Sequence, residues 1–202
     1  MKRKIKGKTV LLATHNEGKV EEIAALLGPL NLNLVNAKQL QLVEPKETSN
    51  TFAGNARIKA HAAAKTTNLP ALSDDSGIEV DALDGAPGVY TADWAETENG
   101  RDFIVAMEKT HKMLTGLGAS PPWRACFRCT MVIAWPDGYD MIFEGKMEGT
   151  VVWPMRGSQG HGYDPIFKPL GSEITFGEMD RWEKNRISHR AIACEKFCAF
   201  FA

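Results

Sequence analysis

ALSDDSGIEVDALDGAPGVYTADW, residues 71–94, places two adjacent aspartates, Asp74 and Asp75, between a short apolar run and an alternating segment. Ile78 and Val80 alternate there with acidic residues, which is the period of a half-buried β-strand. Because Asp, Ser and Gly favour turns, one interpretation of DDSG is a solvated turn that interrupts the strand. The alternative is that the strand ends at DDSG in order to present carboxylates to a metal ion.

Composition restricts the class of protein. The chain has 202 residues, 44 % of them hydrophobic, which suits a single domain spanning residues 1–202, with two lobes sharing a cleft. The 24 Lys and Arg residues balance 25 Asp and Glu residues to a net charge of -1, so a nucleic-acid partner is not indicated. No secretory apolar segment follows the basic start, and no stretch is long enough to span a membrane. We expect a cytoplasmic protein with no membrane partner.

Strand and helix patterns alternate along the chain. Strands are expected at 9–13 and 32–35, and the spacing of Val20, Ile23 and Leu27 predicts a helix between them. Further predictions are a helix from Phe52 capped by Thr51, a helix over 101–117, a hairpin of strands 124–135 and 139–148, a short strand over 151–153, a Gly-rich loop over 156–167 and a closing helix after Ser188. This order indicates an α/β fold, a mixed twisted sheet with flanking helices and two lobes around a central cleft.

The four cysteines include a CxxC at Cys126 and Cys129, together with Cys194 and Cys198, so a four-cysteine zinc site is one interpretation. Residues three apart on a strand face opposite sides of a sheet, however, and Cys126 and Cys129 lie in a β-like run. We therefore expect free thiols in the core, which suits a reducing compartment.

Polar residues with the chemistry of a magnesium–phosphate site recur along the chain. THNEGK follows the first strand and opens a helix, where backbone N–H groups and the helix dipole attract anions. Asn55 and Lys59 share one helix face, with Glu47 just upstream, although such a pair is often only a solvated face. Mg²⁺ takes one or two carboxylates and completes its shell with water and phosphate oxygens. Two further segments, GHGYDP and EKNRISHR, offer backbone donors, Lys184, His189 and Arg190.

These motifs occur in a specific order: T-x-N-x-G-K, E-T-x-x-T-F-x-x-N-A, D-D-S-G-I-x-V-D-x-L-x-G-x-P-G, G-x-G-Y-D-P-I-F and I-S-H-R. Together they resemble the ITPase, or XTP/dITP diphosphatase, family over nearly the whole chain. The resemblance implies a homodimer and Mg²⁺-dependent hydrolysis of ITP, dITP and XTP to the nucleoside monophosphate and pyrophosphate, which cleanses the nucleotide pool.

The resemblance also implies roles for individual residues. It assigns the triphosphate to Thr14, His15, Asn16, Glu17, Gly18 and Lys19. It assigns Mg²⁺ to Glu47, Asp75 and the adjacent Asp74, with Asp75 as the general base. Substrate contacts are expected from Ser76, Asn55 and Lys59, and a base pocket from His161, Gly162, Tyr163, Asp164, Lys184, His189 and Arg190.

One position departs from the family pattern, because His161 stands where the family often has Phe. An imidazole stacks on a purine more weakly than a phenyl ring and carries a pH-dependent charge, so its stacking role stays open. Donors such as Arg190 suit a 6-oxo purine, whereas the 6-amino group of adenine would leave them unpaired. Two alternatives remain: a nucleotide pyrophosphatase with another base preference, and a nucleotide-binding module without turnover.

Overall fold

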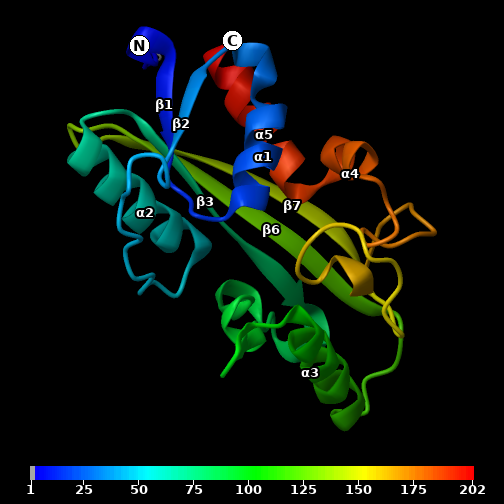
Figure 1. Cartoon of the computed structure of the whole chain (residues 1–202). Helices are drawn as coiled ribbons and strands as arrows, with labels where there is room; N and C mark the ends of the chain where they lie inside the picture. The colour runs from blue at the N-terminus through cyan, green and yellow to red at the C-terminus, as the bar shows by residue number, and fades with distance from the viewer. Residues whose placement is uncertain (1–2) are drawn as a thin grey trace. The chain divides into compact units, whose positions relative to one another are not determined.

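Three parallel strands carry the segments from which the candidate site is built. In the computed structural model, which describes residues 3–202, β1 (Thr9–Leu12) pairs in parallel with β2 (Asn33–Asn36) and β3 (Ala71–Val80). The whole sheet has the order β2-β1-β3-β6-β7-β8, where the last three strands are β6 (Trp123–Ala134), β7 (Asp140–Val151) and β8 (Phe167–Pro169). A second, two-stranded sheet joins β4 (Glu96–Thr97) and β5 (Gly100–Arg101). The predicted mixed α/β sheet with flanking helices is confirmed (Figure 1).

The chain divides into two compact units. Unit 1 comprises Met1–Asp75, Cys129–Gly145 and Arg190–Ala202, and unit 2 comprises Ser76–Arg128 and Lys146–His189. β3, β6 and β7 each contribute residues to both units. No helix within the described range 3–202 is both long and apolar enough to cross a membrane.

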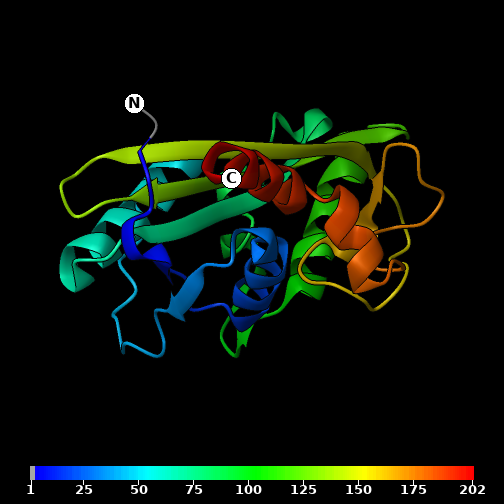
Figure 2. The ribbon, with the colours of Figure 1, turned by 90° about the horizontal axis from the view of Figure 1, so that it is seen from above.

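Unit 1 has helices on both faces of its strands. α1 (Glu17–Leu26) and α5 (His189–Phe201) cover one face, and α2 (Phe52–Thr67) covers the other (Figure 1). Figure 2, the view from above, has α1 and α5 in front of the strands. Val10 and Leu12 of β1 pack with α1 and α5, whereas Leu11 packs with the alanines of α2. Because side chains alternate along a strand, residue parity decides which helix layer each one meets.

Local sequence signals set the helix boundaries. Thr51 Oγ1 accepts a hydrogen bond from Gly54 N at 3.1 Å, so the predicted N-cap of α2 is confirmed. Asn16 Oδ1 accepts one from Lys19 N at 3.1 Å and caps α1 in the same way. The helix predicted over 101–117 is α3 (Phe103–Gly116), capped by Asp102.

Unit 2 contains the C-terminal part of β3, from Ser76 onward, and the N-terminal part of β6, up to Arg128. Ile78 and Val80 of β3 pack with Phe127 of β6, with α3 and with the loop that carries Tyr163. β8 pairs antiparallel with the end of β7, with Gly149 opposite Pro169. α4 (Arg181–Ile187) precedes Ser188, which is the C-cap of that helix.

Several elements differ from the sequence predictions. DDSG does not interrupt a strand, because β3 runs continuously from Ala71 to Val80 and residues 71–75 are all buried. No separate strand occupies 151–153, since Val151 is the last residue of β7. α4 and β8 were not anticipated; both are short, seven and three residues, and too brief for periodicity to mark.

The four cysteines are free thiols. Cys126, Cys129 and Cys194 are buried, and Cys198 is half-buried, as expected for core thiols. Burial raises the pKa of Cys129 to about 12, with a further contribution from the nearby Asp74 carboxylate. These thiols are therefore protonated and unreactive at neutral pH.

Candidate functional site

The parallel pairing of β1 and β3 brings the THNEGK and DDSG segments together in unit 1. Leu12 of β1 is level with Leu72 of β3, so Thr14 and Asp74 each follow two residues later. The helix after β1 covers one face and the helix before β3 covers the other. Ligands of open α/β sheets bind where neighbouring parallel strands send their connections to opposite faces.

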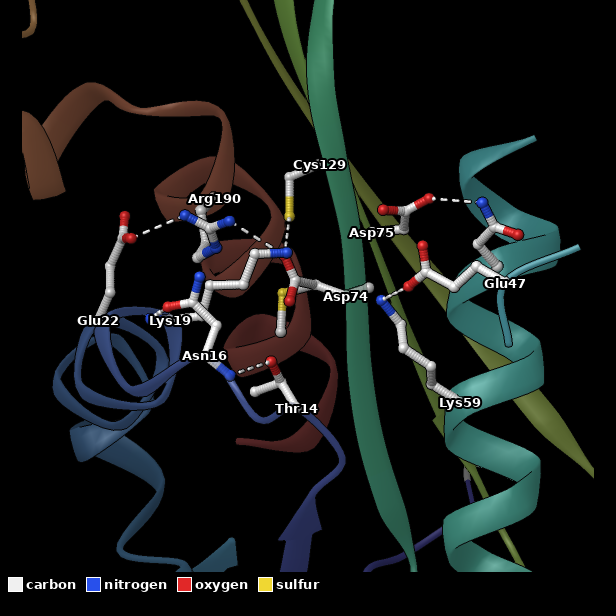
Figure 3. A network of polar contacts seen from close by, with 12 residues as sticks. Thr14, Asn16, Lys19, Glu22, Glu47, Lys59, Asp74, Asp75, Cys129 and Arg190 are labelled. Carbon is white, nitrogen blue, oxygen red and sulfur yellow. Dashed lines mark hydrogen bonds and ion pairs between the residues drawn. The ribbon is translucent and has the colours of Figure 1, made fainter. Parts of the chain in front are cut away.

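Within residues 14–19 the side chains take different directions. Asn16 N donates to Thr14 Oγ1 at 3.3 Å, which closes the turn onto the N-terminus of α1 (Figure 3). His15 Nε2 instead lies 2.8 Å from the Leu42 carbonyl oxygen, and Glu17 forms an exposed ion pair with Lys38. Thr14, Asn16 and Lys19 are thus the side chains placed to meet an anion.

Asp74 and Asp75 point to opposite faces of β3 (Figure 3). Asp74 follows the parity of Leu72 and lies on the α1 and α5 face, whereas Asp75 follows the parity of Ala71 and lies on the α2 face. Adjacent positions in the sequence suggest that the two carboxylates share a site. Their alternation along the strand gives them separate environments instead.

Asp74 is fully buried and lies among cations. Its Oδ2 accepts from Lys19 Nζ at 3.0 Å and from Arg190 Nη2 at 3.0 Å. The Cys129 thiol lies 3.9 Å from the same oxygen. Although burial opposes ionisation, Lys19 and Arg190 hold the pKa of Asp74 well below its usual range. Asp74 is therefore ionised at neutral pH.

Asp75 has the opposite electrostatic environment. Its Oδ2 accepts a hydrogen bond from Asn55 Nδ2 of α2 at 3.2 Å. Burial raises the pKa of Asp75 to about 6 and Glu47 adds to the effect, against the opposing influence of Lys59 and Lys19. A carboxylate with a pKa near neutrality accepts protons far better than an exposed aspartate and still ionises in the physiological range.

Lys59 and Glu47 form an ion pair beside Asp75. Lys59 is buried, and its Nζ contacts Glu47 Oε1, while the Glu47 side chain stays 36 % exposed. Burial alone would lower the pKa of Lys59, but Asp74, Asp75 and Glu47 together raise it. The polar face of α2 carrying Asn55 and Lys59 is therefore buried against carboxylates, which a merely solvated face would not be.

A pocket of about 290 Å³ opens next to Lys59 in unit 1. Its walls are largely apolar and include Ala13, Leu42 and Ala63, with His15 and Glu44 among the polar groups. Lys59 thus borders this pocket and also contacts a carboxylate partner.

The remaining predicted residues belong to unit 2. Asp164 is buried, and its Oδ2 accepts from His161 N at 2.6 Å and from Lys184 Nζ at 2.5 Å. Gly160 allows this arrangement: its φ is +76°, and a Cβ at this position would lie 2.0 Å from Asp164 Oδ2. One carboxylate therefore fixes both the His161–Asp164 loop and the Lys184 ammonium.

Tyr163 and His189 are part of the core of unit 2. The Tyr163 ring packs edge-on against Phe103 at 6.0 Å between centroids, and burial raises the pKa of Tyr163 well above its usual range. The His189 ring stacks on Phe127 at 4.8 Å. The side chain of His161, by contrast, is exposed, and Ser76 is half-buried. A substrate contact from Tyr163 would therefore have to come from its backbone.

The donor set fits Mg²⁺ better than a metal that needs several protein ligands. Residues 3–202 contain no cluster of three or more His, Cys, Asp or Glu side chains suited to a metal ion. Glu47 and Asp75 lie on the same side of β3, and Asp74 Oδ1 is buried without a hydrogen-bond partner among the described residues. One or two carboxylates are the usual protein contribution to a magnesium–nucleotide site.

Sequence reasoning missed two members of this network, Glu22 and Cys129. Glu22 Oε2 accepts from Arg190 Nη1 at 2.7 Å, and Glu22 is buried on α1. Its position three residues after Lys19 was the available signal, because i and i+3 side chains share a helix face. Arg190 was predicted for the base pocket, yet its guanidinium donates hydrogen bonds to Glu22 and Asp74.

Comparison with known proteins identifies one family. The model of the Ham1 family matches residues 10–200. Among curated proteins, the dITP/XTP pyrophosphatases of Ruegeria pomeroyi and Agrobacterium fabrum are 63 % and 53 % identical, covering 98 % and 96 % of this chain and 97 % and 96 % of their own. A solved HAM1 protein from Coxiella burnetii is 35 % identical with a TM-score of 0.87, over 95 % of this chain and 96 % of that one.

Proposed function

Because this chain belongs to the Ham1 family, we propose that it hydrolyses non-standard purine nucleoside triphosphates, dITP and XTP among them, to the monophosphate and pyrophosphate. The enzyme is thus a hydrolase acting on an acid anhydride. The observation that carries the proposal is the buried Asp75 carboxylate, whose pKa is raised to about 6 beside Asn55 and the Lys59–Glu47 pair.

The triphosphate binds, in this proposal, at the N-terminus of α1. Thr14, Asn16 and Lys19 supply a hydroxyl, an amide and an ammonium at the N-terminus of α1, where the helix dipole attracts anions. Lys59 adds a second ammonium from α2. Such fixed cations and dipoles stabilise the charge that develops on the phosphates as the anhydride bond breaks.

Asp75 acts as the general base. Its ionised carboxylate accepts a proton from the water that attacks the triphosphate, and its raised pKa makes that transfer favourable. Asn55 holds the carboxylate through a hydrogen bond at 3.2 Å. Glu47 and Asp75 would hold Mg²⁺, which when bound supplies charge neutralisation at the phosphates. Asp74, also predicted as a ligand, lies on the other face of β3, and we assign it to positioning Lys19.

Recognition of the base is assigned to unit 2. Asp164 orders the backbone from His161 to Asp164, so that the N–H groups of this loop can donate to a 6-oxo purine. Lys184 is a further donor held by the same carboxylate, and Ser76 and His189 complete the proposed set. An adenine 6-amino group would leave such donors unpaired, at a cost of ~1–3 kcal/mol each.

We also propose that the protein is a homodimer, because the family that the sequence resembles implies one. A cytoplasmic location is supported by the four free thiols, which are typical of a reducing compartment.

A substrate panel tests the function. Pyrophosphate release should be fastest with dITP, XTP and ITP, slow with dATP and dGTP, and dependent on added Mg²⁺. Preference for a modified pyrimidine triphosphate would instead indicate a pyrophosphatase of other specificity. Tight binding of dITP without pyrophosphate release would indicate a binding module.

A further inference from the structure

Glu22 is a buried carboxylate to which the proposed reaction gives no role. It lies one turn after Lys19 on α1 and is only 6 % exposed. Its Oε2 accepts from Arg190 Nη1 at 2.7 Å, and its Oε1 has no hydrogen-bond partner among the described residues. Burying an ionised carboxylate costs free energy unless a cation compensates its charge. The role of Glu22 must therefore lie in its interaction with Arg190.

Arg190 bridges two carboxylates. One nitrogen of its guanidinium binds Glu22, and the other donates to Asp74 Oδ2 at 3.0 Å. Lys19 Nζ lies 3.0 Å from the same Asp74 oxygen (Figure 3). Asp74 is therefore shared between Arg190 and Lys19, and the sharing depends on half of the guanidinium being held elsewhere.

The charges of this cluster balance: Lys19 and Arg190 are positive, and Asp74 and Glu22 are negative. Without the charge of Glu22, a buried cation would be left in excess. Arg190 would then be free to bind Asp74 through both nitrogens, the preferred geometry for an arginine and a carboxylate. Asp74 Oδ1 has no hydrogen-bond partner in residues 3–202 and could accept the second bond. Lys19 Nζ would then compete with a bidentate guanidinium for Asp74 Oδ2.

We propose that Glu22 is a positioning residue: by holding one half of the Arg190 guanidinium, it reserves Asp74 for Lys19 and keeps the Lys19 ammonium at the N-terminus of α1. The proposal rests on the proposed binding of the triphosphate by Lys19. Glu22 itself touches neither substrate nor the reacting atoms.

Glu22→Gln removes the charge and keeps the shape and one oxygen acceptor. We expect KM for dITP to rise about tenfold, because a charged hydrogen bond that orders Lys19 is weakened. kcat should stay within about twofold, since a binding defect leaves the chemistry of the bound complex intact. Glu21→Gln is the matched control: it makes the same change of charge at an exposed neighbour on α1 and should leave KM unchanged.

A double-mutant cycle with Lys19→Met separates positioning from general damage. If Glu22 acts through Lys19, the KM effect of Glu22→Gln should largely vanish when Lys19 is already replaced. Additive effects, or a wild-type KM in Glu22→Gln alongside a raised KM in Lys19→Met, would overturn the proposal for Glu22 alone. A wild-type KM in Lys19→Met would refute the role of Lys19 in triphosphate binding, and this proposal with it.

Should Glu22→Gln not yield folded protein, Glu22→Asp provides the same test. It keeps the charge and withdraws the carboxylate by one methylene, so KM should rise by a smaller factor, about threefold, again only when Lys19 is present. The shorter side chain of Glu22→Asp draws the carboxylate away from Arg190. A KM for dITP equal to that of the wild type in this variant would therefore overturn the proposal.

Discussion

Asp75→Asn should abolish turnover and at the same time stabilise the protein at alkaline pH. The amide is nearly isosteric and can still accept the Asn55 hydrogen bond. It carries no charge, however, so the cost of burying an ionised carboxylate disappears. Loss of the general base should lower the rate of pyrophosphate release by ~10²-fold or more.

The size of the stabilisation follows from the pKa of Asp75. The interval between its ordinary value of 3.8 and about 6 in the folded protein corresponds to at most roughly 3 kcal/mol. Since the folded pKa is raised, the stabilising contribution of Asp75 is fully present below pH 3.8 and is lost as the pH rises through about 6. At pH 8 the burial of ionised Asp75 therefore lowers the free energy of unfolding of the wild type by this whole amount, and at pH 4.5 by about 1 kcal/mol. The Asp75→Asn variant has no such loss at either pH.

Urea unfolding in the presence of EDTA at pH 8 and pH 4.5 measures the effect. The free energy of unfolding of Asp75→Asn should exceed that of the wild type at pH 8, by an amount that shrinks at pH 4.5. Asp74→Asn is the matched control on the same strand, and its effect should have the opposite sign. Lys19 and Arg190 lower the pKa of Asp74, so its stabilising contribution is present above pH 3.8, and losing it should cost about 3 kcal/mol or more.

A particular outcome would refute this reasoning. If Asp75→Asn were less stable than the wild type at pH 8, ionised Asp75 would be stabilised by the fold, and its pKa could not be raised. Equal destabilisation by the two substitutions would mean that the two aspartates share one environment.

Three further predictions concern the metal and the loop of unit 2. Mg²⁺ should raise the Tm of the wild type but not of Asp75→Asn, and an equal rise in both would place the ion elsewhere. Gly160→Ala should raise KM for dITP and lower Tm, because the added Cβ would lie 2.0 Å from Asp164 Oδ2; Gly171→Ala, with a similar φ of +82° and open space around it, should change Tm only. His161→Phe should keep kcat/KM for dITP and His161→Ala should cost ~1–3 kcal/mol if the ring stacks on the base, whereas two neutral substitutions would exclude stacking.

Most of the fold was accessible from sequence because its elements are long and periodic or clearly capped. The spacing of Val20, Ile23 and Leu27 located α1, and Thr51 located the start of α2. The family resemblance was confirmed by the Ham1 match over residues 10–200. The continuity of β3 was not predicted, because Asp, Ser and Gly favour turns locally. In the folded protein, Lys19 on one face and Asn55 on the other bind the two aspartates and stabilise them within the strand.

The site was predictable as a list of residues but not as a set of contacts. Side chains one or three positions apart on a strand face opposite sides, so the rule that separates Cys126 from Cys129 also separates Asp74 from Asp75 once DDSG lies within a strand. The i+3 spacing from Lys19 placed Glu22 on the same helix face, but it could not mark Glu22 as buried, because its partner Arg190 lies 168 residues away in the sequence. Only the folded structure shows that this glutamate is buried.

The separation of Asp74 from Asp75 explains how two neighbouring residues of one type can serve opposite purposes. A cation-positioning carboxylate must stay ionised, which requires cations close by, whereas a general base needs a pKa near neutrality, which requires burial with fewer of them. On a helix, adjacent side chains lie about 100° apart and would share much of their surroundings. On β3 they face different helices: Asp74 meets the cations associated with α1 and α5, and Asp75 meets the amide of Asn55 on α2. Moving either residue by one position along the strand would exchange these environments, so the DDSG order itself determines which aspartate is available to accept a proton.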